Sequence, residues 1–294
     1  MARLELIVTR QTLWDQLNAL VAHLEPTVEA LHAYVLSKDV IQADETRWPL
    51  LGTEGASKWH AWAVAREDAI SYRVLGSRSR KAAAEVLGGF TGTAVTDGYA
   101  VYEALANSRD GPGFTLAHCW GHTRRKYVEA AESYPKANEM IDRIGALYAI
   151  EARADEARVT LDVRGAMRRT ESRPIVDDIY RWITTEPALP KSLLGKAIGY
   201  TQRLWPGLVR FVDDARLPLD TNAVERGMRA PALGRKNHHG SRSMRGTKVA
   251  GAFYGLVESA KLAGVDPVAH LREAVRRAIA NPGTVTLPRD LLSD

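Results

Sequence analysis

The chain has 294 residues, of which 45% are hydrophobic and 26% charged, a composition typical of a globular protein. No run approaches the roughly 18 apolar residues that a membrane span needs, and the single cysteine, Cys119, excludes an internal disulfide and favours a reducing cytoplasm. The net charge of +5 permits a polyanionic partner without requiring one.

The first part of the chain predicts short strands between helices. Apolar residues at helical spacing indicate a helix over residues 11–36, with a break or kink at Pro26. The period then changes to that of strands and turns. We expect a strand over 39–45, a hairpin over 58–76, a helix over 79–90, and strands over 92–99 and 113–120.

The second part predicts helices alone. Helical periods run through residues 122–134, 137–159, 172–186 and 192–214, and strand signals are absent there. A further helix starts near residue 220 and leads into a Gly- and Arg-rich loop. Two last helices are expected over 246–264 and 266–281, the second with Asp266 as N-cap and Pro267 at its first position. The order predicts an α/β fold with a mixed five-stranded sheet and an all-helical insertion before residue 220.

The stretch "DTNAVERGMR", residues 220–229, admits two interpretations. Offsets of three and four residues place Asn222, Glu225 and Arg229 on one helix face. Asn222 and Glu225 fit a capping box at a helix start. Alternatively, Glu225 is a metal-binding carboxylate beside a phosphate-binding surface.

A basic window follows that stretch. From Arg226 to Lys248 the chain contains no Asp or Glu, whereas a solvated face usually mixes signs. Its basic residues are Arg226, Arg229, Arg235, Lys236, Arg242, Arg245 and Lys248. The imbalance predicts a surface that faces phosphates.

Two carboxylates stand at the ends of predicted strands, Asp44 in "IQADETRW" and Asp97 in "AVTDGYAVY". Ligands gather at the carboxyl ends of strands in open α/β sheets. Clustered carboxylates need a cation to neutralise them, and hard oxygen ligands select Mg²⁺ or Mn²⁺. Each residue also has a plain structural interpretation, a turn cap for Asp44 and an Asp–Gly turn for Asp97.

Several blocks of the sequence, in order, resemble the insertion-sequence sixty-six family of bacterial transposases. They are "ADET", "TDGYAVY", "AHCWGHTRRKYVEA" and "LDTNAVERGMRAPALGRKNHHGS", and the closing "GVDPVAHL" is also similar to that family. The resemblance runs from about residue 8 to residue 280 and keeps the family's order.

The resemblance implies a ribonuclease-H-like core and an Asp-Asp-Glu triad that binds two Mg²⁺ ions, with Mn²⁺ able to substitute. The triad carries over onto Asp44, Asp97 and Glu225, with the helical insertion between the second and third acids. The implied reaction is hydrolysis at the ends of the element, followed by attack of the freed 3′-hydroxyl on target DNA. The implied partners are DNA, further copies of the chain on DNA and accessory proteins of the same element, in the cytoplasm and at the nucleoid.

We expect an N-terminal helical segment over 1–37, a first core part over 38–124, the helical insertion over 125–216 and a last core part over 217–294. The family pattern differs in two places: Thr221 replaces an Asn, and His238 with His239 replaces a Trp and an apolar residue. The family's N-terminal DNA-binding region is also expected to be missing. A truncated DNA-binding inhibitor and a ribonuclease-H-like nuclease therefore remain alternatives.

Cys119 and His122, three apart in "CWGH", are expected near the active site, because related transposases carry a similar signature; a zinc site is disfavoured by the lack of a second cysteine. Further DNA contacts are expected from residues of two segments. They are Arg124, Arg125, Lys126, Asn222, Arg226, Arg229, Arg235, Lys236, His238 and Arg242. Solvated helix faces and simple exposure are the alternatives for these residues.

Overall fold

A computed structural model describes residues 8–51, 59–108 and 113–292. The chain divides into two compact units, one formed by residues 1–90 with 223–294 and the other by residues 91–222. Lys58, the first residue of the predicted hairpin, lies outside the described residues.

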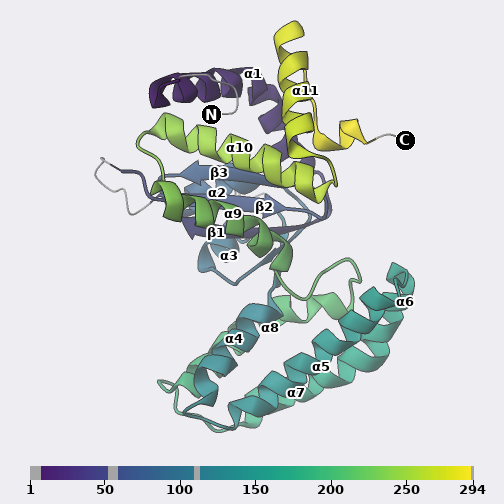
Figure 1. The fold of residues 1–294 in the computed structure, drawn as a ribbon. Coiled ribbons are helices and arrows are strands. Elements are labelled where there is room, and N and C mark those ends of the chain that lie inside the picture. Colours follow the sequence, from purple (N-terminus) through teal and green to yellow (C-terminus); the bar gives the residue numbers. More distant parts are fainter. Residues whose placement is uncertain (1–7, 52–58, 109–112, 293–294) are drawn as a thin grey trace. The chain divides into compact units, whose positions relative to one another are not determined.

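The first unit combines an antiparallel set of strands with helices from both ends of the chain (Figure 1). Its elements are α1 (Arg10–Leu36), β1 (Val40–Arg47), β2 (His60–Ala65), β3 (Ile70–Leu75), α2 (Arg80–Leu87), most of α9 (Asn222–His238), α10 (Met244–Leu262), α11 (Pro267–Ala280) and η5 (Pro288–Leu291). Asp266 caps α11 by accepting the backbone N–H of Ala269 at 2.7 Å, as predicted.

A break or kink was predicted at Pro26; the break is wrong, because α1 continues through the proline, whereas the kink stays a prediction. Leu24 and Leu31 are buried on either side of the proline, in a helix that packs against α10 and α11. Tertiary packing of an apolar face supplies most of a helix's stability in a protein, so it outweighs one lost backbone hydrogen bond.

The second unit pairs two strands and continues as helices (Figure 1). Its elements are β4 (Thr93–Thr96), α3 (Ala100–Ala106), β5 (Thr115–His118), α4 (Trp120–Ala131), α5 (Ala137–Glu156), α6 (Leu161–Met167), η3 (Arg168–Ser172), α7 (Arg173–Thr185), α8 (Leu193–Leu208) and η4 (Arg210–Val212). We call the segment from α4 to α8 the helical block.

The sheet has five strands in the order β3-β2-β1-β4-β5. Strands β1, β2 and β3 pair antiparallel, whereas β4 and β5 pair parallel. The predicted mixed five-stranded α/β sheet is therefore confirmed, and it is consistent with a ribonuclease-H-like core. No helix among the described residues is long and apolar enough to cross a membrane.

Helix α9 runs further than predicted, through Pro231 to His238. A proline removes the N–H that would bond the carbonyl four residues earlier, here that of Gly227. That carbonyl instead accepts the hydroxyl of Tyr72 at 2.8 Å. The predicted Gly- and Arg-rich loop is thus wrong up to His238, because a side chain of β3 replaces the missing hydrogen bond.

Candidate functional site

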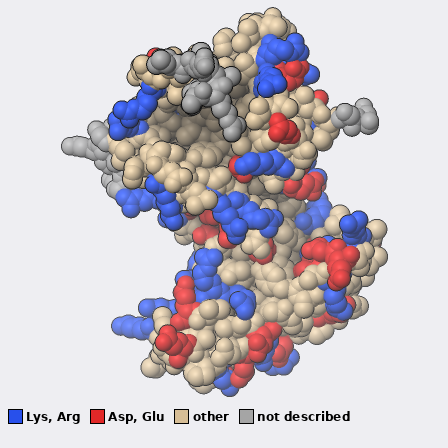
Figure 2. Space-filling view, viewed as in Figure 1, with Lys and Arg blue, Asp and Glu red and all other residues tan. Residues whose placement is uncertain are grey.

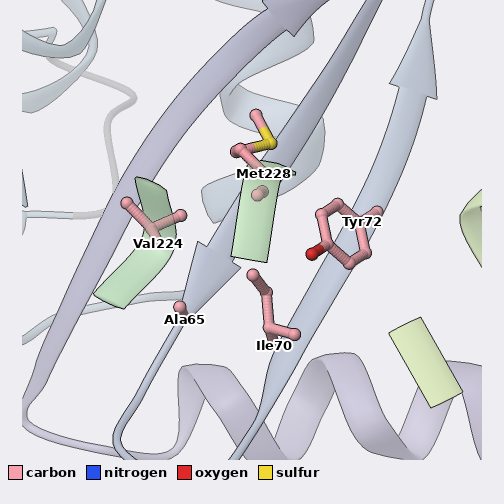
Figure 3. Close-up of a cluster of buried hydrophobic side chains, with 6 residues drawn as sticks. Ala65, Ile70, Tyr72, Val224 and Met228 are labelled. Carbon is pink, nitrogen blue, oxygen red and sulfur yellow. The ribbon is translucent and has the colours of Figure 1, made fainter. Parts of the chain in front are cut away.

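Asp44 lies on the face of the sheet that α9 covers. Residues directly opposite each other on antiparallel strands point to the same face, and Ala63 stands opposite both Asp44 and Tyr72. Ala63 and Tyr72 form a buried cluster with Val224 and Met228 of α9 (Figure 3). Burial of a side chain such as Val224 or Met228 contributes roughly 1.5–3 kcal/mol to the free energy of folding. This packing therefore stabilises α9 on the face of the sheet that carries Asp44.

Two hydrogen bonds align α9 along β1. Near the start of the helix, the backbone N–H of Val224 donates to Oε1 of Gln42 at 3.0 Å. Further along, Nη1 of Arg235 donates to Oγ1 of Thr46 at 2.8 Å. Residues two apart in a strand share a face, so Asp44 lies on β1 between the two residues that anchor α9.

Glu225 directly follows the anchored Val224, in the first turn of α9. The amino end of a helix favours a carboxylate, because its unpaired N–H groups carry partial positive charge. The first unit thus brings Asp44 and the turn that bears Glu225 to the same face of the sheet.

The capping-box interpretation of Asn222 and Glu225 is wrong, because α9 begins at Asn222 itself. The carboxylate of Asp220 accepts the backbone N–H of Asn222 at 3.0 Å and its side-chain amide at 2.5 Å. Asp220 therefore accepts hydrogen bonds at the start of α9, the role that was predicted for Asn222.

Asp97 lies in the second unit, directly after β4. Its Oδ1 accepts the backbone N–H of Tyr99 at 2.8 Å, and Gly98 between them has a φ of +83°. Only glycine adopts that backbone conformation readily. The parallel partner β5 ends at His118, opposite Thr96, so Asp97 and Cys119 follow the carboxyl ends of neighbouring strands.

Cys119 is buried, and burial raises the pKa of its thiol. The hydroxyl of Thr221 donates to the Cys119 sulfur at 3.4 Å. Thr221, which departs from the family pattern, is thus a buried partner of Cys119. His122 is half-buried in the first turn of α4.

The exposed side of α9 is basic. Along it, exposed residues recur every three or four positions: Asn222, Arg226, Arg229, Leu233 and Lys236. Figure 2 shows Lys and Arg side chains of the first unit gathered where Figure 1 draws this helix. Arg242, just beyond α9, is exposed as well.

Two residues that were predicted to contact DNA make contacts within the first unit. Arg235 is bonded to β1 through Thr46. His238 contacts Gly240 O at 2.9 Å through Nδ1, and its ring centroid lies 5.7 Å from that of Trp48. These contacts give both residues a role in fixing the end of α9.

The three basic residues of α4 differ in their surroundings. Arg124 and Arg125 are exposed. Lys126 pairs with Glu129 at 3.1 Å, one turn further along the helix. Arg124 and Arg125 are therefore more exposed than Lys126, and their contact with phosphates stays a prediction.

The structure also identifies two residues that the sequence did not indicate. Gln42 anchors the first turn of α9, and Tyr200 of α8 donates its hydroxyl to the backbone carbonyl of Asp97. Gln42 is two positions before Asp44, so in a strand both point to the same face of the sheet. This spacing is a weak sequence signal for a role beside Asp44. Tyr200 carries no signal, because it is 103 positions from Asp97.

Comparison with known proteins identifies a family. The model of the transposase IS66 family matches residues 1–249. The uncharacterized protein y4jD of Sinorhizobium fredii is 32% identical over 292 residues, which cover 92% of this chain and 56% of that protein. A second uncharacterized protein of that organism, y4hP, is 28% identical over 304 residues, covering 94% of this chain and 54% of that protein. The chain therefore spans about half the length of the curated relatives it matches.

Proposed function

Because the chain belongs to the IS66 family of transposases, we propose that it is the catalytic part of a DNA transposase that cleaves and joins DNA with Mg²⁺. The observation that carries the proposal is the placement of α9 on β1, which brings the turn of Glu225 to the face of the sheet that bears Asp44. Asp97, at the carboxyl end of a parallel strand, is the remaining acid of the proposed triad and the second in chain order.

The donor set fits the ion. Asp44, Asp97 and Glu225 all offer carboxylate oxygens, the ligands that Mg²⁺ and Mn²⁺ prefer. Backbone N–H groups orient two of them: Glu45 donates to Oδ1 of Asp44, and Tyr99 donates to Oδ1 of Asp97, both at 2.8 Å. When bound, a pair of such ions supplies a strong nucleophile and stabilises the leaving oxygen in phosphoryl transfer.

The chain's own residues have two tasks in this proposal. Asp44, Asp97 and Glu225 hold the ions, with no covalent protein–DNA intermediate. Arg226, Arg229 and Lys236 grip the DNA backbone beside the acids, because exposed cations bind phosphates without reading sequence. The attacking group would be water in the cleavage step and the freed 3′-hydroxyl in the joining step.

The experiment is an assay with DNA that carries the ends of the chain's own element, labelled on each strand, and with Mg²⁺, Mn²⁺ or EDTA. Metal-dependent nicking together with joined products supports the transposase. Hydrolysis without joining identifies a nuclease instead, and salt-sensitive binding without cleavage identifies a DNA-binding inhibitor. Absence of both binding and cleavage contradicts the proposal.

A further inference from the structure

Helix α8 of the helical block contacts the turn that carries Asp97, within the second unit. The hydroxyl of Tyr200 donates a hydrogen bond to the backbone carbonyl of Asp97. Because a carbonyl oxygen can only accept, the hydroxyl is the donor in this bond.

Packing brings α8 against the same turn. A Cβ added at Gly98 would lie 2.4 Å from Cδ1 of Leu204, so the leucine occupies the space that the glycine leaves. One turn further along α8, a Cβ added at Gly207 would lie 2.4 Å from the ring of His118, the last residue of β5. Helix α8 thus lies close against the carboxyl ends of both parallel strands.

Arg203 completes the contact. Its Nη1 donates to the carbonyl of Gly98 at 3.4 Å, and its guanidinium carbon lies 5.5 Å from the centre of the Tyr200 ring. Two successive carbonyls, those of Asp97 and Gly98, therefore accept hydrogen bonds from neighbouring turns of α8. These bonds act on the backbone and leave the Asp97 side chain to its bond with Tyr99.

We propose that Tyr200 is a positioning residue for Asp97, and that Leu204 and Arg203 support it in holding the Asp97–Gly98–Tyr99 turn. The inference rests on the proposed function, in which Asp97 is a metal ligand. It assigns the helical block a role in the reaction: α8 fixes the backbone from which the carboxylate projects. A carboxylate whose backbone is free to move loses entropy on binding a cation, so a loosened turn lowers metal affinity.

The test compares Tyr200→Phe with Tyr180→Phe in the full chain. Both changes remove one hydroxyl, but Tyr180 is 51% exposed on α7, and its ring centroid lies 5.3 Å from that of Trp205 in α8. Hydrogen exchange of the peptide that spans Asp97 to Tyr102 reports the turn directly and needs neither metal nor DNA. The half-saturating Mn²⁺ concentration, from calorimetry and from DNA cleavage, reports ligand placement.

We expect Tyr200→Phe to speed exchange in this peptide and to raise the half-saturating Mn²⁺ concentration about 3- to 10-fold, the range that one lost hydrogen bond supports. Cleavage at saturating Mn²⁺ should approach that of the unmodified chain, and Tyr180→Phe should change neither quantity. Exchange and Mn²⁺ dependence that match the unmodified chain, or that shift equally in Tyr180→Phe, overturn the inference.

Two outcomes keep this result separate from the proposed function. If the unmodified chain neither binds Mn²⁺ nor cleaves DNA, the proposed function fails, whereas the exchange measurement still decides whether Tyr200 holds the turn. If Tyr200→Phe does not fold, Arg203→Gln takes its place, because it removes the hydrogen bond to Gly98 from an exposed side chain. We expect Arg203→Gln to speed exchange in the turn and to raise the half-saturating Mn²⁺ concentration, but by less than Tyr200→Phe. If neither quantity changes in Arg203→Gln, the inference is overturned.

Discussion

The two units support their proposed metal ligands in different ways. In the first unit, the support comes from the sheet itself, since Gln42 of β1 bonds the helix turn next to Glu225 across 182 positions of sequence. In the second unit, it comes from outside the sheet, since Tyr200 of α8 bonds the backbone of Asp97. In both cases a long-range polar side chain fixes a backbone group and not the carboxylate. The backbone that carries each acid is therefore held by a side chain remote in sequence, Gln42 in the first unit and Tyr200 in the second.

Removal of one acid at a time tests whether acids of both units are needed for metal-dependent cleavage. Asp97→Asn, which removes the charged ligand and keeps the size, should lower metal-dependent cleavage more than about a hundredfold, because even changes to residues behind a ligand cost 10- to 100-fold. Asp44→Asn and Glu225→Gln should do the same. Steady-state cleavage rates in Mn²⁺ are the measurement, with Asp142→Asn, exposed on α5, as the control. Full activity in Asp97→Asn contradicts the assignment of the triad.

A residue on the other face of the sheet should affect stability and leave metal binding unchanged. His32 of α1 contacts Ser71 at 3.0 Å, and burial lowers the pKa of its imidazole to about 4. The unfolded chain takes up this proton below about pH 6.5, so the contribution to stability is complete above that pH and is lost as pH falls towards 4. The loss amounts to about 3 kcal/mol.

His32→Gln should therefore flatten the dependence of the urea midpoint on pH between 7 and 4. His23→Gln, an exposed change on the same helix, should not alter it. The half-saturating Mn²⁺ concentration should stay the same in both variants. A pH dependence that is unchanged in His32→Gln contradicts the neutral, buried histidine.

The anchor of the first unit has a smaller predicted effect. Gln42→Leu leaves the Val224 N–H without its acceptor, which costs about 1–3 kcal/mol for a buried donor. The variant should lower the melting temperature and raise the half-saturating Mn²⁺ concentration up to about tenfold. Gln42→Glu keeps an acceptor oxygen at the helix amino end, where a negative charge is favourable, so it should retain more stability. If the Leu and Glu variants behave alike, the hydrogen bond is not the anchor.

The smallest predicted effect concerns the exposed side of α9. Arg229→Ala should weaken DNA binding a few-fold and reduce the slope of log affinity against log salt by about 1, as the loss of one phosphate contact does. Arg276→Ala is the matched control, because Arg276 is 67% exposed but already paired with Glu273 at 2.7 Å. Titrations by fluorescence anisotropy at several salt concentrations provide the measurement. Equal slopes for the two variants would place the DNA elsewhere.

The sequence predicts the helices and strands better than the long-range side-chain hydrogen bonds that hold them in place. The strands, the helical block and the cap of α11 at Asp266 follow from local patterns that the structure keeps. The end of α9 was mispredicted, since Pro231 and Gly234 are helix breakers and the compensating Tyr72 hydroxyl lies 155 positions from Gly227. Tyr200 escaped prediction for the same physical reason. A single side chain that acts across the fold leaves no periodic or local trace.

We propose that Asp44, Asp97 and Glu225 hold divalent metal together. A crystal structure of the chain with Mn²⁺ and DNA, with the metal located by its anomalous scattering, tests it most directly. We expect Mn²⁺ to be bound by all three carboxylates at about 2.0–2.6 Å. Mn²⁺ that is absent from these residues, or carboxylates separated by well beyond about 8 Å in an ordered core, would contradict it, because a pair of ions about 4 Å apart spans roughly 8–9 Å between the ligand oxygens on its two sides.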